Sequence, residues 1–140
     1  METRLEFNDR LLSLGLARVS EAAAIAATKF IGAGDEKAAD QAAVDAMRTQ
    51  LNMLDINGKV VIGEGERDEA PMLYVGEQVG SGNGPAVDIA LDPLEGTNLT
   101  AKDMPNALTV IAMGPKGSLL NAPDVYLSLI HISEPTRLAI

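Results

Sequence analysis

Residues 87 to 97, with the sequence VDIALDPLEGT, carry the side chains best suited to chemistry. The first half of this stretch alternates apolar residues with Asp88, Ala90 and Asp92, which predicts a strand with one apolar and one acid-bearing face. Pro93 has no N–H group to donate to a sheet, so the strand is predicted to end at Asp92. That end would place a carboxylate at the rim of a sheet, where functional groups gather.

Asp92 and Glu95 lie on either side of the bend at Pro93, and Gly96 and Thr97 follow directly. Two carboxylates beside free backbone amides and a hydroxyl suit a divalent cation that itself holds a phosphate group. The alternative is a strand end with an ordinary turn, in which Asp and Gly are common. Asp92 and Glu95 are therefore candidate metal ligands.

Asp40 belongs to a helix expected from Glu36 to about Leu54, with Asp35 as its N-cap. It begins a stripe at helical spacing that continues with Val44, Met47, Leu51 and Leu54. A carboxylate on the face that buries these residues must be paired, hydrogen-bonded or bound to a metal ion. The alternative is that Asp40, one turn into the helix, faces solvent and interacts with the helix dipole.

A third group of acids follows the short apolar strand expected at 60–62. Glu64, Glu66, Asp68 and Glu69 are interleaved with glycines at the end of this strand. Such strand ends are favoured places for functional groups in α/β proteins. The alternative is a solvated acidic loop. If the functional interpretation holds, Glu64 is expected to lie near Asp40 in space.

The other expected elements position these three acidic segments. They are a helix over 5–31, a turn at 56–58, a short helix over 72–79, a strand over 107–113, and a hairpin strand over 118–122. Carboxylates without cysteine or clustered histidine point to Mg²⁺ or Mn²⁺. These ions most often serve phosphate transfer or hydrolysis.

Composition limits the classes of function. The chain has 140 residues, which is the size of one domain, and a net charge of −9 that argues against nucleic acid or an anionic membrane as a partner. It has no cysteine and one histidine, His131, so thiolate sites and a Ser-His-Asp triad are not expected. No apolar run reaches the roughly 20 residues of a membrane span, and no signal peptide is visible. We expect a soluble, cytoplasmic protein.

Several motifs together resemble class II fructose-1,6-bisphosphatase, a member of the lithium-sensitive sugar-phosphatase superfamily. They are GEGE at 63–66, EAPMLY at 69–74, DIALDPLEGT at 88–97, NAL at 106–108 and LNAPDVY at 120–126. Glu95 stands where the wider superfamily has a second Asp, which is the class II form. The resemblance implies an α/β (mixed α+β) fold, a layered α-β-α-β-α sandwich of which only the N-terminal part is present.

The resemblance also implies roles for individual residues. Asp40 and Glu64 would bind one divalent ion, Mn²⁺ or Mg²⁺, and Asp92 and Glu95 a second. Glu95, Gly96, Thr97 and Tyr126 would contact the sugar bisphosphate. Asp68 and Thr97 would position or deprotonate the attacking water, and Glu66 is a third candidate catalytic residue. The implied activity is hydrolysis of the 1-phosphate of fructose 1,6-bisphosphate to fructose 6-phosphate, a step of gluconeogenesis, in a cytoplasmic enzyme expected to be a homo-oligomer at full length.

Residues 127–140 fit nothing in the family, so 1–126 is interpreted as the N-terminal part of the sugar-phosphatase domain and 127–140 as an artefactual tail. Family members are more than twice as long as this chain, and the fragment itself is expected to be inactive. Two alternatives stay open. One is a related phosphatase acting on sedoheptulose 1,7-bisphosphate, an inositol phosphate or a nucleotide bisphosphate. The other is a non-catalytic acidic cation-binding module.

Overall fold

A computed structural model describes residues 9–64 and 72–121 of the chain. Glu66, Asp68, Tyr126, His131 and the proposed tail at 127–140 lie outside the described residues. In chain order the elements are α1 (Asp9–Thr28), α2 (Glu36–Asn52), β1 (Asn57–Ile62), β2 (Gln78–Val79), β3 (Ala86–Glu95), α3 (Thr97–Ala101) and β4 (Leu108–Pro115). The described residues thus form a mixed α/β structure, as expected.

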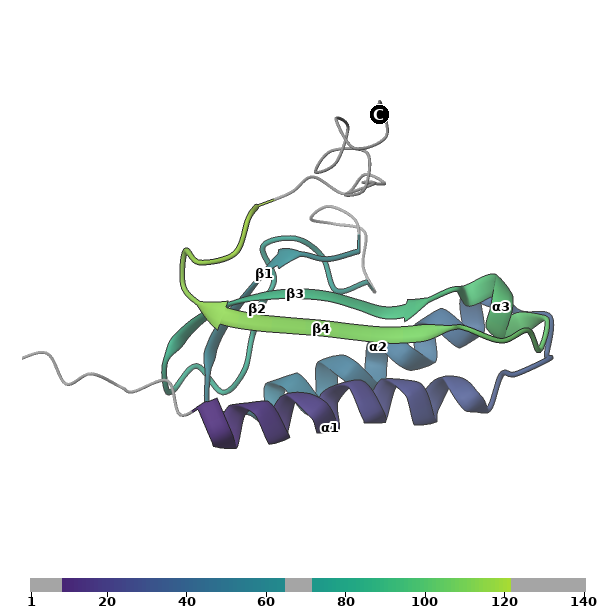
Figure 1. Ribbon diagram of the computed structural model, residues 1–140, viewed down its shortest axis with the longest axis horizontal. Helices are drawn as coiled ribbons and strands as arrows, with labels where there is room; N and C mark the ends of the chain where they lie inside the picture. The colour runs from purple at the N-terminus through teal and green to yellow at the C-terminus, as the bar shows by residue number, and fades with distance from the viewer. Residues whose placement is uncertain (1–8, 65–71, 122–140) are drawn as a thin grey trace, which may run out of the picture.

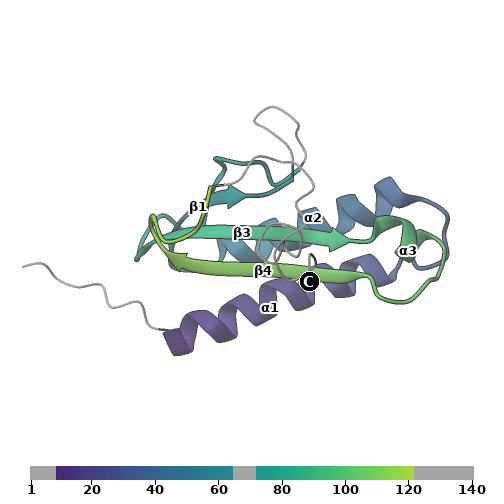
Figure 2. The ribbon, with the colours of Figure 1, turned by 45° about the horizontal axis from the view of Figure 1, so that its top comes forward.

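The elements form two layers, with α1 and α2 side by side across one face of a sheet (Figure 1). The strand order is β2-β1-β3-β4. β1 and β3 are parallel, whereas β2 and β4 run antiparallel to their neighbours. In the described part of the chain β4 is therefore an edge strand, which Figure 2 draws between β3 and α1.

The core lies between the helices and the sheet, and small side chains build much of it. Alanines at buried positions of both helices allow α1 and α2 to approach each other closely. Most of the fully buried larger side chains come from α2, β1 and β3, and these include Met47, Leu51, Val60, Val87 and Ile89. The predicted stripe on α2 is confirmed, since Val44, Met47 and Leu51 are buried and Leu54 packs against the core. Asp35 caps α2 as predicted, because its Oδ1 accepts the N–H of Ala38 at 3.0 Å.

α1 departs from one expectation. Its segment Leu11–Thr28 has a mean hydropathy of 1.3, so by length and composition it could cross a membrane. By length and composition, this segment contradicts the prediction that no part of the chain is apolar enough to span a membrane. Val19, Ala23 and Ala27 pack this helix into the core, while Leu11 and Ile25 are exposed on its other side. Core helices of soluble proteins pass the same test, so this apolarity does not by itself place α1 in a membrane.

The expected helix over 72–79 is wrong. This segment instead runs beside β1, where the Gly76 N–H donates to the Val60 carbonyl at 2.7 Å and the Val60 N–H donates to the Glu77 carbonyl at 3.0 Å. It ends in the two-residue strand β2. These backbone groups bond to a neighbouring strand rather than within one helical turn. Gly76 has φ of 96°, which also interrupts a helix.

Four smaller differences concern turns and ends. The turn expected at 56–58 is partly strand, since β1 begins at Asn57. The hairpin strand expected from Ser118 is not formed within the described residues, which end at 121. α3 was not predicted. The strand expected to end at Asp92 continues through Pro93 to Glu95.

Pro93 is tolerated because the pairing of β3 with β4 is irregular there. Asp92 pairs with Val110 and Glu95 with Leu108, so two residues of β3 face one residue of β4. Such a bulge leaves residues out of the ladder, and a proline at that position loses no hydrogen bond. The N–H of Leu94 donates instead to Asp92 Oδ1 at 3.2 Å.

Candidate functional site

Three elements bring the predicted acids to one place. β1 and β3 are parallel, so their carboxyl ends reach the same edge of the sheet, and the first turns of α2 lie at that edge as well. A cavity of about 400 Å³ opens there. Its lining residues are Glu36, Lys37, Asp40, Glu64, Met72, Asp92, Leu94, Glu95, Gly96 and Thr97. All predicted site residues that the structure describes therefore lie around one cavity.

Asp40, Glu64 and Asp92 interact strongly with one another. Burial raises the pKa of Glu64 to about 8, and the charges of Asp40 and Asp92 contribute to this rise. Burial also raises the pKa of Asp40, as does the charge of Asp92, while a hydrogen bond with Glu64 offsets part of the effect. Acids held close together at a partly buried place gain from a positive charge placed between them. The predicted proximity of Asp40 and Glu64 is confirmed, and Asp40 is half-buried rather than directed into solvent.

Two oxygens of this cluster fit the chemistry of a bound cation. Asp40 Oδ1 and Glu64 Oε2 are buried and accept no hydrogen bond in the described structure. A buried acceptor without a partner is costly, and a hard cation such as Mg²⁺ or Mn²⁺ would satisfy it. Across residues 9–64 and 72–121, however, no group of three acidic or histidine side chains has the arrangement of a complete ion-binding site. The donor chemistry fits a divalent ion, while a full ligand set is not formed by these residues alone.

Gly96 shapes the floor of the cavity between β3 and α3. Its φ is 90°, in the left-handed region that favours glycine, and a Cβ atom there would lie 2.9 Å from Leu99 Cδ1. This turn lets Thr97 begin α3 directly after Glu95. The carbonyls of Thr100 and Ala101 in α3 in turn accept the N–H groups of Gly32 and Gly34, each at 2.9 Å. α3 thereby ties the end of β3 to the loop that leads into α2.

Sequence reasoning assigned no site role to four residues that line the cavity, namely Glu36, Lys37, Met72 and Leu94. Lys37 had a usable signal, because it precedes Asp40 by three residues and so shares its helix face. Met72 lies in the irregular segment before β2, and Leu94 lies in the bulge of β3. No local sequence pattern indicated either feature.

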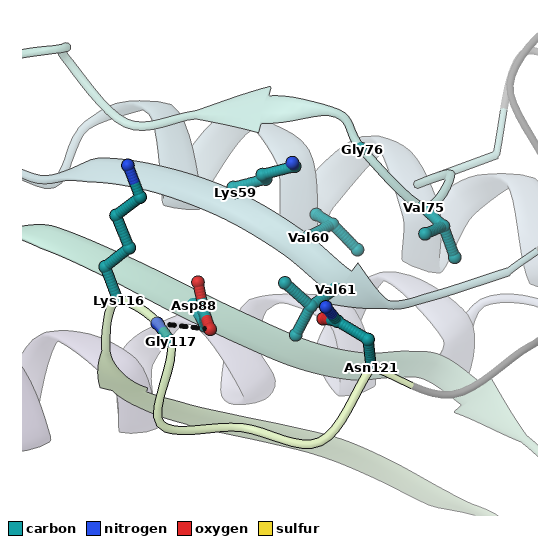
Figure 3. Close-up of a pocket in the computed structure, with 9 residues that line it drawn as sticks. All are labelled: Lys59, Val60, Val61, Val75, Gly76, Asp88, Lys116, Gly117 and Asn121. Carbon is teal, nitrogen blue, oxygen red and sulfur yellow. Dashed lines mark hydrogen bonds between the residues drawn. The ribbon is translucent and has the colours of Figure 1, made fainter.

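A larger cavity of about 540 Å³ lies on the face of the sheet that points away from α1 and α2, and Figure 3 shows its lining. Lys59, Val61 and Lys116 line it, and Asp88 Oδ2 accepts the N–H of Gly117 at 2.8 Å. Asp88 is thus a buried acid with a partner in the protein, and the cavity gathers no cluster of acids. The smaller acidic cavity is the candidate site.

Comparison with known proteins identifies the family. The family model described as bacterial fructose-1,6-bisphosphatase, glpX-encoded, matches residues 10–140. "Fructose-1,6-bisphosphatase 1 class 2" of Escherichia coli is 58% identical over 123 residues, which cover 88% of this chain and 37% of the relative. "Fructose-1,6-bisphosphatase class 2" of Haemophilus influenzae is 55% identical over 129 residues, which cover 92% of this chain and 39% of the relative.

A third relative carries a second activity in its name. "D-fructose 1,6-bisphosphatase class 2/sedoheptulose 1,7-bisphosphatase" of Prochlorococcus marinus is 55% identical over 113 residues, which cover 81% of this chain and 34% of the relative. The chain thus spans little more than a third of the length of the curated relatives it matches. With the family model matched from residue 10 onward, the chain belongs to the family of bacterial, glpX-encoded fructose-1,6-bisphosphatases.

Proposed function

We propose that the acidic cavity is part of a metal-dependent phosphatase site that hydrolyses the 1-phosphate of fructose 1,6-bisphosphate. The observation that carries this proposal is the meeting of Asp40, Glu64 and Asp92 at one sheet edge, where burial and the neighbouring carboxylates raise the pKa of Glu64 and of Asp40. Such a cluster is costly unless it serves a cation. The names of the Escherichia coli and Haemophilus influenzae relatives support the substrate.

Following the resemblance to the family, we assign four acids of the cavity to two ligand pairs for Mn²⁺ or Mg²⁺. Asp40 and Glu64 are assigned to one ion, and Asp92 with Glu95 to a second. When bound, these ions polarise the phosphoryl oxygens and lower the pKa of a nearby water molecule. The two buried oxygens without partners, Asp40 Oδ1 and Glu64 Oε2, support the first pair.

The protein groups then orient the reactants. Glu95, Gly96 and Thr97 line one side of the cavity, where backbone N–H groups and a hydroxyl suit phosphate oxygens. Tyr126 is assigned to the sugar bisphosphate, and Asp68 and Thr97 are assigned to the water. Glu66 is a further catalytic candidate. Of these four residues, the structure describes only Thr97. Water attacks phosphorus while its proton passes to a carboxylate. The bond from phosphorus to the C1 oxygen breaks, and that oxygen takes up a proton to become the C1 hydroxyl. The products are fructose 6-phosphate and inorganic phosphate, without a phosphoenzyme.

Activity is assigned to the full-length form of this enzyme, acting in the cytoplasm in gluconeogenesis as a homo-oligomer with the layered α-β-α-β-α fold. The 140-residue chain alone is proposed to be inactive. Support comes from the share of the relatives that the chain spans, about a third, and from the open side of the acidic cavity. A site open to water stabilises developing charge poorly.

A second substrate has support of its own. The Prochlorococcus marinus relative is named for sedoheptulose 1,7-bisphosphate as well, so this bisphosphate is the second candidate. Inositol phosphates, nucleotide bisphosphates and the non-catalytic cation-binding module have no such support. The Gly96–Thr97 turn also argues against a simple cation buffer, which needs no phosphate-binding amides.

The test is a chimera in which residues 1–126 continue into the C-terminal part of the Escherichia coli relative. Phosphate release is measured with each sugar bisphosphate and an inositol phosphate, with Mn²⁺ and after chelation. Metal-dependent release from fructose 1,6-bisphosphate supports the proposal, and preferential release from another substrate would replace it. The 140-residue chain is assayed in parallel, and turnover comparable to the chimera would refute its assigned inactivity.

A further inference from the structure

Arg48 makes an ion pair away from the acidic cavity. It lies in α2, two turns beyond Asp40, and its Nε and Nη2 donate to Glu77 Oε2 and Oε1 at 2.9 and 3.1 Å. The same Nη2 donates to the Met72 carbonyl at 2.7 Å. The side chains of Arg48 and Glu77 are only 27% and 11% exposed. Such forked, partly buried contacts are stronger and more directional than a surface ion pair.

These contacts hold both ends of one short segment. Residues 72–77 run beside β1, as Figure 3 shows around Val75 and Gly76. Arg48 binds the backbone at Met72 and the side chain at Glu77. Because α2 is a regular helix packed into the core, it provides a rigid support for this irregular segment.

The same segment fixes the backbone of Glu64. The Glu64 N–H donates to the Leu73 carbonyl at 2.9 Å. The two chains approach so closely that a Cβ atom on Gly63 would lie 2.6 Å from the Leu73 oxygen. The position of Leu73 therefore sets the position of Glu64, and Met72 beside it lines the acidic cavity.

We propose that Arg48 is a positioning residue of the acidic site. It holds Met72 and Leu73 against the end of β1 and so keeps the Glu64 carboxyl facing Asp40 and Asp92. The inference rests on the proposed function only where it concerns metal affinity, because the positioning of Glu64 can be measured without a metal ion.

The experiment uses the 140-residue chain and compares amide hydrogen exchange by NMR in metal-free buffer. The reference is Ile89, a fully buried residue of β3. In Arg48→Met we expect the Glu64 amide to exchange at least about tenfold faster relative to the Ile89 amide, as for loss of charged hydrogen bonds. Arg18→Met, on the exposed side of α1, is the matched control and should change neither amide. Arg48→Lys keeps the positive charge but cannot donate two parallel hydrogen bonds to the Glu77 carboxylate, so the Glu64 amide should be partly protected from exchange.

A double variant separates positioning from simple stability. Arg48→Met leaves Glu77 partly buried without its cation, whereas Arg48→Met with Glu77→Gln removes that unpaired charge. We expect the double variant to regain global stability, while the Glu64 amide still exchanges faster, relative to the Ile89 amide, than in the parent chain. Return of Glu64 protection together with stability would show a merely structural role and overturn the proposal, as would unchanged exchange in Arg48→Met.

Mn²⁺ titration gives the second readout. If Arg48 positions Glu64 for a metal ion, the Arg48→Met variant should bind Mn²⁺ at least about tenfold more weakly than the parent chain. Equal affinity would overturn this part of the inference. If the parent chain binds no Mn²⁺, the affinities are compared in the chimera that continues residues 1–126 into the Escherichia coli relative. Failure of the chimera to bind Mn²⁺ would count against the proposed function, while the amide comparison would still decide whether Arg48 positions Glu64.

Discussion

Replacing Glu64 by Gln should stabilise the metal-free chain, and the effect should grow with pH. The pKa of Glu64 in the folded chain is about 8, against an ordinary value of 4.5. Between these two values the folded state holds a proton that the unfolded state releases. The free energy of unfolding therefore falls as pH rises through this window, and the stabilising contribution is complete only below the lower value. Glutamine resembles the protonated acid and removes this loss.

The shift sets an upper limit for the effect. At 1.36 kcal/mol per pKa unit, the change from 4.5 to about 8 corresponds to at most about 5 kcal/mol. The Glu64 carboxyl is only partly buried and titrates together with Asp40 and Asp92, so solvent screening reduces this limit. We expect a gain of about 1–2 kcal/mol at about pH 8 and close to none near pH 4.5.

Urea unfolding followed by circular dichroism, in the presence of a chelator, measures this gain. With a typical urea dependence of about 1–3 kcal/mol/M, the midpoint of Glu64→Gln should lie about 0.3–2 M above the parent at the higher pH. Glu21→Gln, on the exposed side of α1, is the matched control and should leave the midpoint unchanged. A parent chain whose stability is flat or rises across this pH range would refute the reasoning, as would a glutamine variant less stable than the parent.

Three further predictions concern the residues around the cavity. In the chimeric enzyme, Asp92→Asn should lower kcat/KM for phosphate release at least about 100-fold, since a metal ligand is lost; loss of less than tenfold, or an equal loss in exposed Asp55→Asn, would contradict the assignment. Gly96→Ala should destabilise the chain by about 1–3 kcal/mol in thermal unfolding, because φ is 90° and Leu99 occupies the space; an unchanged midpoint would show that the turn relaxes freely. Asp35→Ala should cost about 1 kcal/mol through loss of the α2 cap, measured by urea unfolding, and Asp35→Asn should restore most of it.

The sequence by itself determined the elements whose signals are local. The apolar spacing of α1 and α2, the Asp35 cap and the apolar run of β4 all appear in the structure near their predicted places. The spacing that begins at Asp40 also indicated that this acid shares a face with core residues. Helix periodicity and capping depend on neighbours three or four residues away, so they can be read along the chain.

Local reasoning failed where distant backbone groups decide the conformation. Residues 72–79 are not helical because β1 provides partners for their backbone. Pro93 does not end its strand because a bulge against β4 removes it from the ladder. α3 was missed because it depends on the glycine turn at Gly96 and on contacts with the loop before α2.

The candidate site divides in the same way. The sequence supplied the acids Asp40, Glu64, Asp92 and Glu95, because carboxylates at strand ends and on a core-facing helix stripe are visible as residue types and spacing. Only the tertiary structure placed Asp40 and Asp92 close enough to raise the pKa of Glu64, and it added Lys37 and Met72 to the same cavity. The physical reason is that desolvation and Coulomb interactions depend on distances across the fold, which parallel pairing of β1 with β3 and the packing of α2 set together.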